Sequence, residues 1–137
     1  MIFSKKSNDK NTDLIKVAAL LIHAAKIDDN FSNQEEEIIK KALIKMGANN
    51  QNVENIIKEG KIKEANSNQI LDFTKEVKNM DEKNKIKIVE ALWEIIYSNK
   101  NADIYETNLM RRLEGLLYID SKIMGDIKDK IKNRNKE

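Results

Sequence analysis

The sequence has no cysteine, no proline and only four glycines among its 137 residues. Without cysteine, the chain cannot form a disulfide scaffold, a thiolate nucleophile or a zinc–thiolate site. Without proline and with so few glycines, very little in the chain interrupts a helix. Runs of alternating polar and apolar residues long enough for a β-strand are also missing. These absences favour an all-α protein.

The chain also lacks an excess of one charge, because 25 lysines and arginines stand against 23 aspartates and glutamates. The resulting formal charge of +2 does not indicate a nucleic-acid partner, and we expect none. No stretch approaches the roughly 20 apolar residues that a membrane span needs. The charged start of the chain lacks the apolar centre of a signal peptide. We therefore expect a cytoplasmic protein without a transmembrane segment.

The composition, 40% hydrophobic and 35% charged, is typical of one compact globular domain. Apolar residues recur with the helical period almost throughout the chain. We expect a single compact bundle of about seven short helices over residues 12–132. A flexible N-terminal tail at 1–11 and a frayed C-terminal tail at 133–137 complete the expected domain organisation.

Capping residues divide this pattern into helices. Ser32 with Glu35 predicts a capping box, and Asp103 with Glu106 predicts a second one. Gly47 stands where a residue in the left-handed conformation ends a helix. Further helices are expected over about 52–63, after Ser67, after Asp81, and from Asp120 or Ser121.

The chain contains an internal repeat, since residues 12–47 and 82–118 align at a constant offset of 71 residues. At this offset Asp28 matches Asn99, and Glu35 matches Glu106. Two amphipathic helices always share an apolar period, but a shared loop length with two capping boxes rarely arises by chance. We therefore expect a helix-loop-helix duplication with its two loops on related surfaces.

Each loop combines aspartate or asparagine with a glutamate in the first turn of the next helix. The first copy offers Asp28, Asn30 and Glu35, and the second offers Asn99 and Glu106. Calcium and magnesium need several such oxygen ligands, but the spacing is not that of the calcium loop of about twelve residues. The same residue types also close turns and cap helices. The residues alone leave a cation site and ordinary capping as alternatives, and capping is the commoner arrangement.

The second copy carries motifs that resemble the tellurite-resistance TerB family. They are Leu92-Trp93-Glu94, the loop up to Glu106, and Arg111-Arg112 with the leucines that follow. Residues 21–35 are similar to the family's first acidic motif, and the resemblance covers about residues 12–132. It implies an all-helical duplicated fold, divalent-cation binding, and a role in tellurite and other chemical stress. The resemblance does not point to an established catalytic activity.

The resemblance implies a weakened metal site, because the family favours Glu, Asp and Glu in each copy. His23 replaces a carboxylate in the first copy and Asn99 replaces one in the second, while Asp29 and Lys100 stand at family glycines. The expected cation is calcium, magnesium or zinc, and His23 favours zinc. As an alternative, His23 is a structural residue that pairs with Glu94, its mate in the repeat. The candidate ligands are Asp28, Glu35, Glu94 and Glu106, followed by His23, Asn30 and Asn99.

We therefore expect a non-enzymatic TerB-like domain that serves chemical stress response as a metal-responsive or protein-docking module. The alternative is a metal-independent scaffold for protein–protein interaction or a co-chaperone-associated module. The expected partner is another protein or a second copy of the chain, and peripheral membrane association through a protein complex also fits the resemblance. A hydrolase that uses the carboxylates as acid and base is the least favoured interpretation.

Overall fold

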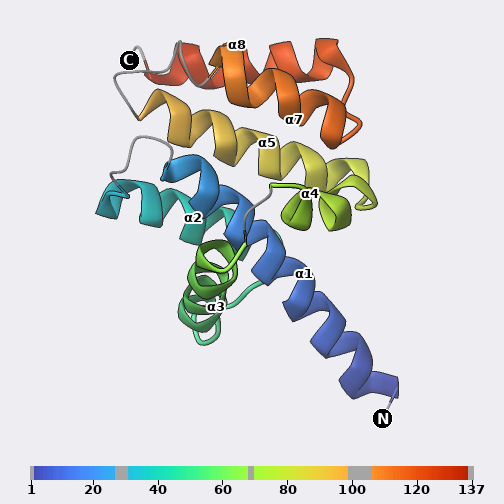
Figure 1. The fold of residues 1–137 in the computed structure, drawn as a ribbon. Helices are drawn as coiled ribbons and strands as arrows, with labels where there is room; N and C mark the ends of the chain where they lie inside the picture. The colour runs from blue at the N-terminus through green and yellow to red at the C-terminus, as the bar shows by residue number, and fades with distance from the viewer. Residues whose placement is uncertain (1, 27–30, 68–69, 99–105, 136–137) are drawn as a thin grey trace.

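The computed structural model describes residues 2–26, 31–67, 70–98 and 106–135, and it confirms the predicted all-α bundle (Figure 1). These residues form seven α-helices and one short π-helix, with no strand among them. The elements are α1 (Ile2–Ala25), α2 (Asn33–Lys45), α3 (Val53–Ala65), α4 (Leu71–Lys78), α5 (Glu82–Tyr97), η1 (Glu106–Met110), α7 (Arg111–Leu116) and α8 (Ser121–Asn135). Within these ranges, no helix has the length and apolar character required to span a bilayer.

The second half of α1 is the centre of the bundle. Its residues from Val17 to Ile22 are almost completely buried, so this part of the helix is covered on all sides. It contacts α2, α3, α4 and α5. α5 in turn packs on α8, so that α5 lies between the α1–α2 layer and the α7–α8 layer (Figure 1). A helix that is apolar all round is stable only inside such a shell.

The N-terminal end of α1 lies within the segment predicted as a tail. The helix begins at Ile2 rather than near residue 12, and its first half projects away from the other helices (Figure 1). The chain has no proline at all and no glycine before Gly47, so nothing in this segment interrupts a helical backbone. The C-terminal helix likewise extends to Asn135.

The first predicted capping box is present at the start of α2. The backbone N–H of Glu35 donates to Ser32 Oγ at 3.1 Å, and the N–H of Ser32 donates to Glu35 Oε1 at 2.9 Å. Asp81 caps α5 as predicted, because its side chain accepts from the N–H of Asn84 at 2.9 Å. Asp103, expected to start the next helix, lies outside the described residues. The described chain resumes at η1, a π-helical turn that leads into α7.

The end of α2 confirms the prediction for Gly47. Gly47 has a φ of 117°, which is the left-handed region that glycine adopts without a steric penalty. Its N–H donates to the carbonyl oxygen of Ile44 at 3.1 Å, and the N–H of Ala48 donates to that of Leu43 at 3.0 Å. These two bonds form a Schellman motif, which satisfies carbonyl groups in the last turn of the helix.

The end of α7 repeats this motif with a tyrosine in the glycine position. Tyr118 has a φ of 54° and donates its N–H to the carbonyl oxygen of Gly115 at 3.3 Å. The N–H of Ile119 donates to that of Glu114 at 3.2 Å. Tyr118 follows Gly47 by the 71 residues of the repeat, so the helix ends of the two copies agree in backbone geometry. Only the second copy accepts the strain of a side chain there.

α1 and α3 approach closely at Gly60. A methyl group added to Gly60 would lie 2.8 Å from the Cβ atom of Ala18. Both residues are buried, so two small residues allow the two helix backbones to meet. In contrast, an added methyl group at Gly125 in α8 meets nothing within 4 Å.

We predict that Gly60→Ala lowers the free energy of unfolding by about 1 kcal/mol, because overpacking outweighs the gain in helix propensity. The matched control Gly125→Ala should raise it by about 0.5–1 kcal/mol, since open space leaves only the propensity gain. Urea denaturation of both variants checks this. Equal stabilisation of the two would contradict the close contact between α1 and α3.

We predict that Tyr118→Gly unfolds with a free energy about 1 kcal/mol higher than Tyr118→Ala. Both substitutions remove the ring, so the difference between them reports only the left-handed conformation. Urea denaturation measures it, and Gly47→Ala should show the same cost in the first copy. A more stable alanine variant at position 118 would argue against a strained backbone.

Candidate functional site

The predicted metal ligands are only partly within the described residues. Asp28, Asn30 and Asn99 lie outside them. Glu106 is the first residue of η1, of which the backbone is described. The remaining candidates, His23, Glu35 and Glu94, belong to α1, α2 and α5, respectively.

Glu35 is engaged in the capping box that begins α2. Its side chain is 4% exposed, and Oε1 accepts hydrogen bonds from both the N–H and the hydroxyl of Ser32, at 2.9 and 3.0 Å. A carboxylate at this position also meets the positive end of the helix dipole. This is the capping role that the spacing of the two residues left open beside metal binding.

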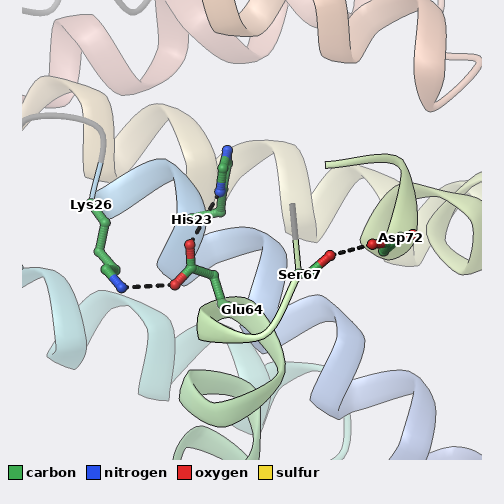
Figure 2. Close-up of polar contacts among 5 residues, drawn as sticks. All are labelled: His23, Lys26, Glu64, Ser67 and Asp72. Carbon is green, nitrogen blue, oxygen red and sulfur yellow. Dashed lines mark hydrogen bonds and ion pairs between the residues drawn. The ribbon is translucent and has the colours of Figure 1, made fainter. Parts of the chain in front are cut away.

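His23 pairs with Glu64 rather than with Glu94, so the predicted pairing within the repeat is wrong. His23 Nδ1 lies 3.3 Å from Glu64 Oε2, and Lys26 Nζ lies 2.8 Å from Glu64 Oε1 (Figure 2). The reason is packing: the last turns of α1 lie against α3, which carries Glu64. Sequence reasoning missed Glu64, because no local pattern links it to a histidine 41 residues earlier.

Glu94 faces the C-terminal helix. Its Oε1 lies 3.6 Å from Arg134 Nη1 in α8. Glu90, one turn earlier, lies 3.7 Å from Lys130 Nζ in the same helix. Because α5 packs on α8, both carboxylates form ion pairs with α8.

The described carboxylates therefore do not gather around one point. Among residues 2–26, 31–67, 70–98 and 106–135, no three histidine, aspartate or glutamate side chains could share one metal ion. At His23 and Glu64, the ammonium group of Lys26 already occupies the place of a cation beside the carboxylate. In this structure, the contacts of His23 and Lys26 with Glu64 join the end of α1 to α3.

A groove of about 630 Å³ lies between α1, α3 and α4. Its apolar residues are Ile15 and Phe73, together with Ile62, which is 48% exposed. Its polar residues are Glu59, Lys63, Asn66, Ser67 and Asp72. The hydroxyl of Ser67 donates to the carboxylate of Asp72, so that the start of α4 is tied to the end of the α3 segment (Figure 2).

An ion pair near this groove joins α4 to α1. Lys16 Nζ donates to Glu76 Oε1 at 2.9 Å. This hydrogen bond and the positive charge of Lys16 lower the pKa of the Glu76 carboxyl below its ordinary value. The groove could not be predicted from local sequence patterns, because its walls come from three helices that meet only in the folded chain.

Comparison with protein families matches residues 14–129 to the family model described as Tellurite resistance protein TerB. No curated protein and no solved structure matches the chain significantly. The matched range includes the second half of α1, the groove, and all but the first two residues of the two repeat copies. The motifs that suggested the family thus fall within a match that covers most of the sequence, and this chain belongs to the TerB family of tellurite resistance proteins.

Proposed function

We propose that this chain is a non-enzymatic protein-docking module in the response to tellurite and related chemical stress. The observation that carries the proposal is the groove between α1, α3 and α4. Its exposed Ile62 offers apolar area to a partner, and the charged groups of Glu59, Lys63 and Asp72 surround it. An apolar centre with a polar rim is the usual composition of a protein–protein interface.

The polar contacts of the described carboxylates support binding rather than catalysis. Glu35 serves its own helix N-terminus, Glu64 pairs with His23 and Lys26, and Glu94 pairs with Arg134. These groups hold helices in place, and rigid helices present a groove with little conformational cost on binding. Membership of the TerB family supplies the physiological context of the proposal.

We predict that Ile62→Glu abolishes growth on tellurite in host cells that depend on this chain. A buried charge in the interface would weaken docking by at least tenfold, whereas an exposed side chain contributes little to folding. The measurement is survival on tellurite, together with the melting temperature of the purified variant.

The matched control is Ile44→Glu in α2, where another isoleucine is 37% exposed. It should grow like the unchanged chain. Normal growth of the Ile62→Glu variant at normal protein levels would contradict docking through the groove.

A metal-responsive role is the second candidate. It is favoured by the position of His23 and Glu64, which meet at the end of the helix that leads into the first acidic loop, where a metal ion would take the place of the Lys26 ammonium group. An imidazole and a carboxylate are suitable ligands for zinc. The ligands from the two loops, Asp28 and Glu106 above all, would have to complete the site.

We predict for this role that calcium, magnesium or zinc raises the melting temperature by several degrees. Binding at ten times the dissociation constant stabilises a fold by about 1.4 kcal/mol. The double variant Asp28→Ala with Glu106→Ala should remove the effect, while the control Glu37→Ala with Glu114→Ala should keep it. Unchanged melting curves with all three metals would leave docking as the proposed function.

A further inference from the structure

Tyr118 combines a strained backbone with an unusually exposed aromatic ring. Its φ of 54° is in the left-handed region, and the side chain is 72% exposed. The equivalent position in the first copy, Gly47, shows that the same helix end can form without a side chain. A residue that costs stability and buries little area is expected where the side chain has another use.

The ring lies at the edge of a small apolar hollow. The hollow has a volume of about 110 Å³, and its apolar walls are Ile86, Ile119 and Ile123 beside Tyr118. Lys78 Nζ lies 5.0 Å from the ring centroid, a cation–π contact that holds the ring in place. A hollow of this size suits one branched aliphatic side chain.

Lysines outnumber carboxylates at this hollow. Lys85 and Glu82 line it, Lys78 lies over the ring, and Lys122 follows in the first turn of α8. Within the described ranges, none of the three lysines has a carboxylate oxygen within 4 Å of its Nζ atom. The carboxylate of Asp120 instead accepts the backbone N–H of Lys122 at 2.8 Å.

α4 extends the same surface. Leu71, which is 47% exposed, Lys75 and Lys78 follow one another at the i, i+4 and i+7 positions of one face. Asp72 and Phe73, which line the groove described above, belong to another face of α4. The surface of Leu71, Lys78, Lys85, Ile86, Tyr118 and Ile123 is hereafter called the Tyr118 surface, and it is distinct from the groove.

We propose that the Tyr118 surface docks an acidic segment of a partner protein. An aliphatic side chain of that segment enters the hollow beside Tyr118, and its carboxylates pair with Lys78 and Lys85. Charge complementarity selects the acidic partner. The tyrosine ring supplies a rigid contact of the kind that dominates binding energy at interfaces. This inference does not depend on the groove, so either docking proposal can be disproved without affecting the other.

The test uses the full chain and a fluorescein-labelled peptide of about ten residues, with two central leucines and glutamates on both sides. Fluorescence anisotropy at low salt should show binding that weakens as salt rises. Tyr118→Ala and Tyr118→Gly should both weaken binding at least tenfold, although the two variants differ in stability. Tyr118→Phe should bind within a factor of two of the unchanged chain, because the ring is retained.

The charge contribution has its own matched variants. Lys78→Gln with Lys85→Gln should weaken binding severalfold and flatten its salt dependence. The control Lys41→Gln with Lys58→Gln removes two exposed lysines from α2 and α3 and should change neither. The groove variant Ile62→Glu should also bind the peptide normally, which separates this proposal from the proposed function.

Three results would overturn the proposal. The first is no binding of the acidic peptide at millimolar concentration, and the second is binding that Tyr118→Ala leaves unchanged. The third is equal binding of a peptide in which glutamine replaces every glutamate. Vesicles of phosphatidylserine and phosphatidylcholine provide the last comparison: if only the vesicles bind and binding requires Tyr118, the surface recognises lipid and the proposed acidic segment is wrong.

Discussion

The burial of α1 is the constraint on which the rest of the fold depends. From Val17 to Ile22 the helix exposes almost nothing, so α2, α3, α4 and α5 must all find a place against it. Small residues make this possible, since Gly60 of α3 meets Ala18 at a distance that no larger pair would allow. The groove and the His23–Glu64 contact both lie where α3 meets α1, so both are consequences of the same close approach.

Local features of this fold could be read from the sequence, and long-range ones could not. The Ser32–Glu35 box and the Gly47 helix end involve residues within one or two turns, so their spacing determines them. The contact of His23 with Glu64 depends on how α1 and α3 pack, which periodicity does not specify. The start of α1 at Ile2 was missed for a different reason: charge suggested a tail, but charge alone does not prevent a helix.

For the candidate sites, too, local features could be predicted from the sequence and long-range ones could not. The sequence singled out Glu35, and its structural role is the capping that a glutamate at that spacing most often performs. It did not single out the groove, whose lining comes from three helices. Tyr118 was within the aligned repeat, opposite Gly47, but its backbone conformation could not be expected, because a tyrosine rarely adopts a positive φ. The repeat becomes most informative where its two copies share a backbone and differ in side chain.

The paired helix ends at Gly47 and Tyr118 have a consequence for how this architecture can change. Duplication supplies one backbone position twice, and the strain at the second is confined to a single residue after the last turn of α7. Leu113 and Leu117 fill the interior beneath it, independently of the outward side chain. The side chain at position 118 can therefore be replaced without repacking the interior. Natural variation or protein engineering can thus change the surface chemistry at the end of α7 while the bundle stays the same.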